Sequence, residues 1–301
     1  MKGNVKNLGD KITSWLFLVP TLIFLGITAL FPLVYSIYLS LFRLKLNLPN
    51  QKLKFIGLGN YVKMLGDEVL KRCTLNTIVF AIVSVGAEML LGLAIAMVIS
   101  SDKKWSKWVL SLLMIPMIMA PVAAGTLWRM MLDSSTGVIN YFLVLVGFPN
   151  IPWLSKPFTA MVSVIGVNVW QLTPWVTIIL AAALKGIPRQ TIEAGMVDGA
   201  SRWQIFTKII IPYLKPVIII ALMIRIIDAF KVFDTVYVMT GGGPGIATEM
   251  LPNFIYRQGL KYFDAGYAAA LAIIFIIFMS LVTYSFIQLR VKEQKKTRGS
   301  V

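Results

Sequence analysis

Residues 265–289 read AGYAAALAIIFIIFMSLVTYSFIQL and contain no charged side chain. A helix needs about 20 mostly apolar residues to cross the hydrocarbon core of a bilayer. Backbone polar groups must be satisfied within the chain there, so an uncharged run of this length predicts a membrane-spanning helix. The composition of the whole chain agrees: 57% of its 301 residues are hydrophobic and only 14% are charged, whereas soluble domains carry about 25% charged residues.

The same criterion predicts an all-α membrane protein with six transmembrane helices. The predicted spans cover residues 14–42, 73–100, 108–132, 157–184, 209–238 and 265–289, within a transmembrane domain at 12–290. Residues 134–155 are also uncharged, but two glycines and two prolines interrupt them. We therefore expect an interfacial helix and a loop in that segment rather than a seventh span.

The remaining charges are mostly basic, since 29 lysines and arginines stand against 13 acids and give a formal net charge of +16. In a soluble protein this surplus would indicate nucleic acid, but here the bases flank the predicted spans. An even number of spans places both termini on one side, and most of the flanking bases gather there, which is typical of cytoplasmic segments. We expect cytoplasmic tails at 1–11 and 291–301, a lipid bilayer as surroundings and no nucleic-acid partner.

The connection between the fourth and fifth predicted spans, residues 185–208, carries helix signals of its own. Pro188 suits the first turn of a helix, and Glu193 lies in its early turns, where the helix dipole favours an acid. Gly199 supplies a stop, and residues 200–208 can begin a second helix. The residues predict a short amphipathic helix–turn–helix, and a helix that lies in the membrane interface is one interpretation of it.

The same segment resembles the EAA motif of bacterial ABC-importer permeases. That motif reads Glu-Ala-Ala, three residues, Gly, nine residues, Ile, one residue and Leu-Pro. It is matched here by Glu193, Ala194, Gly195, Gly199, Ile209, Ile211 and Pro212, with Gly195 in place of the second Ala and Ile211 in place of the Leu. The resemblance implies that this loop, including Asp198, is a cytoplasmic coupling helix that docks on a separate ATP-hydrolysing subunit.

Further stretches are similar to the carbohydrate branch of these permeases, so the resemblance covers nearly the whole chain. They are Phe55–Tyr61, Asn76-Thr77, Asp198–Ser201, Phe230–Asp234, Tyr237–Gly245 and Phe263–Ala270. Within that branch the chain looks like the first of two paired permeases, similar to the larger maltose-permease subunit without its extra N-terminal spans and outer domain.

The resemblance implies one half of the translocation pathway of an ATP-driven importer of sugars or related polyols, located in the bacterial inner membrane. The sequence has no Gly-x-x-x-x-Gly-Lys-Ser/Thr loop, so ATP and Mg²⁺ are expected on a partner, and this chain is expected to bind no cofactor and to be no enzyme. The implied partners are a second six-span permease, two copies of a cytoplasmic ABC ATPase and an extracytoplasmic substrate-binding protein.

Amide and aromatic side chains in the fourth predicted span are candidates for the substrate pathway. Asn168, Gln171 and Trp175 fall on one helical face. Amides bond hydroxyl groups as donors and acceptors, and an aromatic ring suits the apolar face of a sugar. The maltose-type site also draws on this span, with an asparagine at the place of Asn168. Interhelical hydrogen bonding to the partner permease is the structural alternative.

Ionisable side chains inside spans are costly and therefore functional candidates as well. The fifth predicted span carries four of them at steps of three, namely Arg225, Asp228, Lys231 and Asp234. We expect Asp228 and Lys231 in its outer half, where an incoming substrate is first held, with internal ion pairs as the alternative. Glu88 is expected to pair with Arg129 or Arg225, and Met117 is a weaker candidate for the cavity lining.

A second class of protein also fits these features: an ion-coupled secondary transporter of small polar solutes, driven through the charges of the fifth span. Such carriers usually show two similar halves, and we find no convincing repeat between residues 1–150 and 151–301. Transport by the chain alone in liposomes, under an ion gradient and without an ATPase, would identify this class.

Overall fold

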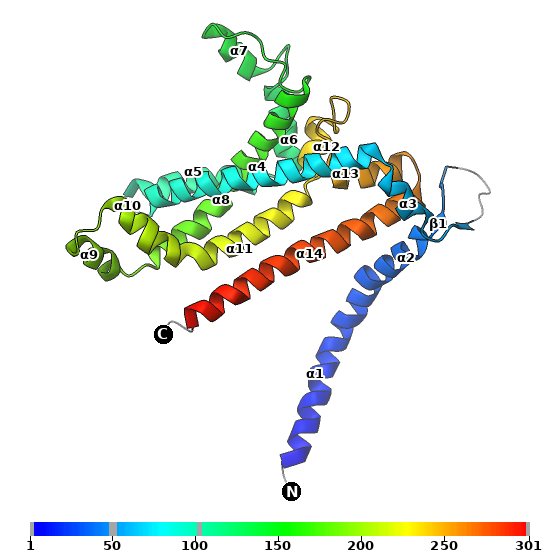
Figure 1. The fold of residues 1–301 in the computed structure, drawn as a ribbon, viewed down its shortest axis with the longest axis horizontal. Coiled ribbons are helices and arrows are strands. Elements are labelled where there is room, and N and C mark those ends of the chain that lie inside the picture. Colours follow the sequence, from blue (N-terminus) through cyan, green and yellow to red (C-terminus); the bar gives the residue numbers. More distant parts are fainter. Residues whose placement is uncertain (1–2, 48–52, 101–103, 299–301) are drawn as a thin grey trace. The chain divides into compact units, whose positions relative to one another are not determined.

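The computed structural model describes residues 3–47, 53–100 and 104–298, and most of them lie in helices (Figure 1). In chain order the helices are α1 (Gly3–Leu25), α2 (Phe31–Ser40), α3 (Gly59–Leu65), α4 (Glu68–Ile99), α5 (Lys104–Ile118), α6 (Pro121–Met131), α7 (Val138–Leu145), α8 (Pro157–Lys185), α9 (Arg189–Val197), α10 (Arg202–Ile205), α11 (Ile211–Phe230), α12 (Asp234–Met239), α13 (Leu251–Tyr256) and α14 (Ala265–Arg298). Turns of π-helix occupy Gly26–Leu30, Phe206–Ile210 and Arg257–Lys261. Strands β1 (Phe42–Arg43) and β2 (Lys54–Phe55) pair antiparallel.

Long apolar helices account for most of the predicted spans. In the described part of the chain, five segments are long and apolar enough to cross a membrane: Trp15–Ser40, Glu68–Ile99, Pro157–Lys185, Arg202–Phe230 and Ala265–Lys292. A sixth crossing requires α5 and α6 to count as one span, and these helices meet at 95°. Helix α7, with eight residues, is too short to cross and lies in the segment expected to be interfacial.

The span predicted over 108–132 is not one helix, since the chain breaks between α5 and α6. Ala120 is extended, with ψ of 137°, as a residue before proline prefers to be. Pro121 then begins α6 in its first turn, where its missing N–H costs no hydrogen bond. The Met119 carbonyl accepts a hydrogen bond of 2.9 Å from Nε2 of Gln171, so α8 supplies a partner at the break.

The fifth predicted span, 209–238, also needs correction. The helical segment begins at Arg202, before the predicted start at 209, and ends at Phe230. Lys231 is the C-cap residue that follows it. Phe233 has φ of −136° and ψ of −61°, so the chain leaves helical geometry before α12 begins at Asp234. Asp234 lies in the first turn of α12, where an acid stabilises the start of a helix, and the apolar run to 238 thus forms two helices.

The segments expected as tails continue the first and last helices. Helix α1 begins at Gly3, and α14 extends to Arg298, while residues 1–2 and 299–301 lie outside the described residues. The chain folds as two compact units. Unit 1 comprises residues 1–67 and 255–277, and unit 2 comprises residues 68–254 and 278–301.

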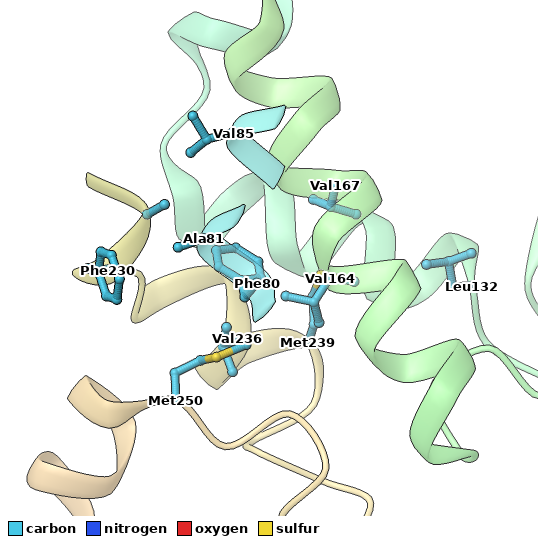
Figure 2. Close-up of a cluster of buried hydrophobic side chains, with 11 residues drawn as sticks. Phe80, Ala81, Val85, Leu132, Val164, Val167, Phe230, Val236, Met239 and Met250 are labelled. Atoms are coloured by element: carbon cyan, nitrogen blue, oxygen red, sulfur yellow. The ribbon is translucent and has the colours of Figure 1, made fainter. Parts of the chain in front are cut away.

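The core of unit 2 lies where α4 and α8 meet α11 and α12 (Figure 2). Its buried side chains are Phe80, Ala81, Val85, Leu132, Val164, Val167, Ala229, Phe230, Val236, Met239 and Met250. Phe230 also meets Phe278 of α14 edge to face, with ring centroids 5.2 Å apart. This packing fixes α4, α8 and α11 side by side, and these three helices carry most of the candidate pathway residues.

Close packing of α4 on α8 yields a prediction at Gly92. A Cβ atom at Gly92 would lie 2.7 Å from Cγ1 and 2.9 Å from Cβ of Val176, closer than side chains pack. We expect Gly92→Ala to lower the unfolding free energy by about 1–3 kcal/mol through overpacking. Unfolding of the purified protein in a detergent–denaturant titration measures this loss.

Gly86 supplies the matched control because it lies in the same helix and a Cβ there would meet nothing within 4 Å. Gly86→Ala should therefore be neutral or mildly stabilising. The double variant Gly92→Ala/Val176→Ala should recover part of the loss. Equal effects of the two single variants would contradict the packing argument.

Unit 1 is held together by polar contacts around the start of α14. Asn60 donates to the carbonyls of Ser40 and Phe42, at 2.8 and 3.0 Å. The Tyr267 hydroxyl donates to Oδ2 of Asp67 at 2.6 Å. Gly266 passes so close to the Phe42 carbonyl that any Cβ would collide with it. These contacts fix the β1–β2 ribbon against α3 and the first turn of α14.

Candidate functional site

A buried ion pair joins α4 and α11 inside unit 2. The Glu88 side chain is fully buried, and that of Arg225 is 4% exposed. Nε of Arg225 donates to Oε2 of Glu88 at 2.7 Å, and Nη2 donates to Oε1 at 3.3 Å. This two-point arrangement is the favoured geometry for a guanidinium and a carboxylate. Of the two partners expected for Glu88, the structure selects Arg225, whereas Arg129 donates to the Val238 carbonyl at 3.0 Å.

The ion pair extends into a row of polar groups, which we call the Glu88 cluster: Glu88, Asn168, Arg225, Asp228 and Lys231. Nδ2 of Asn168 donates to Oε1 of Glu88 at 2.8 Å, which adds α8 to the contact. Nη1 of Arg225 donates to Oδ2 of Asp228 at 3.3 Å. Nζ of Lys231 lies 3.6 Å from Oδ1 of Asp228. Two acids and two bases thus alternate along the cluster.

Exposure increases along the Glu88 cluster. Its inner end is buried, whereas the side chains of Asp228 and Lys231 are 47% and 55% exposed. A charge inside a membrane protein normally faces another charge or a polar cavity. The buried pair of Glu88 and Arg225 therefore holds α4 and α11 together. The half-exposed pair of Asp228 and Lys231 presents its charged groups on the surface at the end of α11.

The other candidates for the pathway occupy different surroundings. Gln171 is buried and donates to the Met119 carbonyl, so its amide stabilises the α5–α6 break. Trp175 is partly buried against an apolar cluster that includes Val176 and Leu180. Met117 is half-buried in α5. The structure thus brings Asn168, Asp228 and Lys231 into one cluster, and Gln171, Trp175 and Met117 lie outside it.

The loop between α8 and α11 folds as a helix, a turn and a second helix. Helix α9 follows Pro188 and contains Glu193, Ala194 and Gly195. Gly199 has φ of +77°, a conformation that favours glycine. The Ala200 N–H donates to the Gly195 carbonyl at 2.9 Å and closes the C-terminal turn in the manner of a Schellman motif.

Residues after the turn begin the next helix with a capping box. The Ser201 N–H donates to Oε1 of Gln204 at 2.7 Å, and the Gln204 N–H donates to Oγ of Ser201 at 3.3 Å. The following π-turn ends where the Ile211 N–H reaches back to the Phe206 carbonyl. Pro212, which lacks an N–H, follows Ile211 in the first turn of α11.

Glycine at position 195, where the motif has alanine, also has a structural explanation. A Cβ at Gly195 would lie 2.9 Å from Cδ1 of Ile209, so an alanine here requires the end of the isoleucine side chain to shift. The hydroxyl of Tyr213 donates to the Gly186 carbonyl at 2.8 Å and ties the two ends of the loop together. Contacts of Ile209 with α9 and of Tyr213 with Gly186 therefore both connect the start of the fifth span to the segment before the turn.

The surface of this loop is open and partly apolar. Glu193, Ala194 and Asp198 are exposed, and the side chains of Met196 and Val197 are 58% and 87% exposed. Trp203 on the second helix is 70% exposed. Apolar side chains that project from a structured loop typically mark a contact surface for another protein.

A separate hollow of about 470 Å³ lies beside α7, among residues 134–150. Asp133 closes the turn that leads to this hollow. Its Oδ1 accepts four hydrogen bonds, from the N–H and the hydroxyl of Ser135 and from the N–H and the hydroxyl of Thr136. These hydrogen bonds hold the pKa of Asp133 well below its ordinary value. The bond from the Ser135 hydroxyl has the largest effect. The hollow contains none of the predicted pathway residues.

Apolar spanning helices, a charged cluster within them and an exposed helix–turn–helix between two spans define a multi-pass membrane permease. The chain belongs to the family of binding-protein-dependent transport system inner membrane components, whose model matches residues 88–294. The match includes Glu88 at its first position, α8, the loop with Glu193 and Gly199, and α11.

Similar proteins are permeases of ABC transporters. The chain is 32% identical to the trehalose/maltose transport system permease protein MalF of Thermococcus litoralis, over 92% of both chains. It is 32% identical to the sulfoquinovosyl glycerol transport system permease protein SmoG of Agrobacterium fabrum, over 94% of this chain and 92% of that one. Its fold matches a chain of a bacterial alginate ABC transporter solved with an alginate pentasaccharide-bound periplasmic protein, with a TM-score of 0.82, 23% identity and coverage of 93% and 94%.

Proposed function

We propose that this chain forms one half of the translocation pathway of an ATP-driven sugar importer. The observation that carries the proposal is the exposed helix–turn–helix at 189–205. Met196 and Val197 at the end of its first helix are exposed, and Gly199 with its positive φ forms the turn to the capped second helix. Such a surface suits docking on a separate ATPase. Family membership favours this function over an ion-coupled carrier, and the sugar permeases among the similar proteins support the substrate class.

The importer requires partners with defined roles. A second six-span permease encloses the pathway, two ATPase subunits bind ATP and Mg²⁺, and an extracytoplasmic protein delivers the sugar. The loop at 185–208 then faces the cytoplasm, and so do both termini, as the distribution of bases predicts. Closure of the ATPases moves the two loops and changes the side to which the pathway opens.

The exposed end of the Glu88 cluster is the part of the proposed pathway that a substrate reaches most directly. Asp228 and Lys231 present charged groups, whereas the amides of Asn168 and Gln171 already donate hydrogen bonds within the chain. We infer that Asp228 and Lys231 contact hydroxyl groups, that Asn168 positions Glu88, and that Gln171 maintains the α5–α6 break. Trp175 and Met117 complete the lining through apolar contacts.

Alanine substitution separates these roles. We expect Asp228→Ala to reduce sugar uptake by about tenfold with little change in thermal stability, because hydrogen bonds to a charged group contribute about 1.5–3 kcal/mol. Asn168→Ala should lower stability instead. The measurement is uptake of labelled maltose and trehalose by the transporter in liposomes, with ATP inside and binding protein outside.

The same liposomes test the function as a whole. Uptake that needs ATP, the second permease and the ATPase supports the importer. Uptake by this chain alone under a proton or sodium gradient would contradict it. Unchanged affinity and rate after alanine substitution at Asn168, Gln171 and Asp228 together would exclude these residues from the pathway.

A further inference from the structure

An exposed row of aromatic rings follows the end of the first span onto the β1–β2 ribbon, all within unit 1. Its rings belong to Phe31, Tyr35, Tyr38, Phe42 and Phe55. Successive centroids are 6.2, 6.4, 4.5 and 5.3 Å apart. Phe31 and Phe55 are 66% and 65% exposed, and both tyrosines are about half exposed. Phe42, in the middle of the row, is partly buried, and the other four rings are exposed.

The ribbon carries two cations on its other face. Phe42 pairs with Phe55, and Arg43 pairs with Lys54. Neighbouring residues of a strand point to opposite faces, so the aromatic pair and the cationic pair lie on opposite sides. Like charges directly across a ribbon repel each other. No carboxylate in the described part of the chain forms an ion pair with Arg43 or Lys54, and the nearby Asp264 already pairs with Lys63 at 3.2 Å.

The position of the ribbon indicates what could balance these charges. It begins two residues after Ser40, where the span Trp15–Ser40 ends, and so lies at the boundary between hydrocarbon and water. Aromatic rings concentrate at that level. A segment with one aromatic face and one cationic face lies flat in the interface, with its cations among the lipid phosphates.

We propose that the β1–β2 ribbon and the end of α2 bind the headgroup of an anionic phospholipid. The aromatic row contacts the upper part of the acyl chains. Residues opposite each other in a ribbon have Cβ atoms about 5 Å apart, so the long side chains of Arg43 and Lys54 reach one phosphate group. The phosphate then relieves their mutual repulsion. A lipid fits better than an acidic protein because the aromatic row holds the ribbon at the depth of the headgroups.

The test compares lipid binding to the detergent-purified, assembled transporter by native mass spectrometry. The probes are dioleoylphosphatidylglycerol, dioleoylphosphatidylcholine and inorganic phosphate. We expect Arg43→Gln/Lys54→Gln to weaken phosphatidylglycerol binding about 30-fold, from the usual contribution of two bases at an anionic surface. Phosphatidylcholine binding should not change. The control is Arg72→Gln/Lys156→Gln, which removes one exposed arginine and one exposed lysine from unit 2 and should have no effect.

A second variant separates weaker lipid binding from loss of the ribbon's structure. Arg43→Glu places opposite charges across the ribbon, which favours the native pairing, yet it should abolish the preference for phosphatidylglycerol. Equal lipid affinities in wild type and both ribbon variants would overturn the proposal. So would complete displacement of the lipid by inorganic phosphate, which would indicate a free-anion site. Unchanged lipid binding with weaker capture of the binding protein would assign the ribbon to an acidic protein surface.

Discussion

Arg225→Met should lower the unfolding free energy of the assembled transporter by about 3–5 kcal/mol, the largest stability effect that we expect from a single substitution. The change removes both hydrogen bonds from Arg225 to Glu88 and leaves a fully buried carboxylate with only the Asn168 amide. An unpaired charge in this position is costly because the Glu88 side chain is fully buried, and Arg225 is the base that pairs with it among the described residues. Unfolding of the detergent-purified complex in a denaturant titration measures the loss.

The double variant Glu88→Leu/Arg225→Met decides whether the loss comes from the unpaired charge or from lost packing. Replacing a whole buried pair by apolar residues is often neutral or stabilising, so the double variant should recover most of the stability. Asp228→Asn, at a half-exposed position, is the control and should cost less than about 1 kcal/mol. A double variant as unstable as Arg225→Met would contradict the charge argument. If the Glu88 cluster also serves the pathway, sugar uptake will stay low even where stability returns.

Long apolar helices could be predicted from the sequence because the bilayer imposes a local rule on length and polarity. The α5–α6 break is different. Pro20, Pro174 and Pro216 all lie inside helices that continue past them, so a proline alone does not predict a break. The distinguishing contact is the one from Gln171 to the Met119 carbonyl, 52 residues apart, and no local pattern reveals it.

The candidate site also has features that depend on neighbouring residues in the sequence and features that depend on contacts between distant ones. The turn at Gly199 follows from spacing and from the conformational freedom of glycine, both of which are local. The partner of Glu88 depends on how α11 packs against α4, and the residues alone left Arg129 and Arg225 as equal candidates. The apolar run carried the predicted fifth span past Phe230. Val236, like Met239 after it, is apolar for a different reason, because it packs α12 into the core shown in Figure 2.

Glu193→Lys should reduce ATP-driven uptake by at least about tenfold and leave folding and membrane insertion unchanged. The Glu193 side chain is exposed and forms no hydrogen bond or ion pair within the described residues, so its reversal affects only a partner surface. A reversed charge in a docking contact costs several kcal/mol. The measurement compares sugar uptake with ATP hydrolysis in the same liposomes. Glu68→Lys is the control: Glu68 is also exposed, pairs with Lys71 on the surface of its own helix, and lies at the end of α4 opposite the end that packs beside this loop.

Gly199 provides a second test of coupling that depends on backbone geometry rather than charge. A Cβ at Gly199 would meet nothing within 4 Å, so Gly199→Ala acts only through the cost of a positive φ, about 1–2 kcal/mol. Gly199→Asn should be milder because asparagine tolerates this conformation. Gly147 has φ of +89° and equally open surroundings in another loop, so Gly147→Ala imposes the same strain away from the docking surface. If the turn transmits ATPase motion, uptake per ATP hydrolysed will fall for Gly199→Ala, less for Gly199→Asn and not for Gly147→Ala. Equal ratios in all three variants would mean that the position of α9 is not what couples hydrolysis to transport.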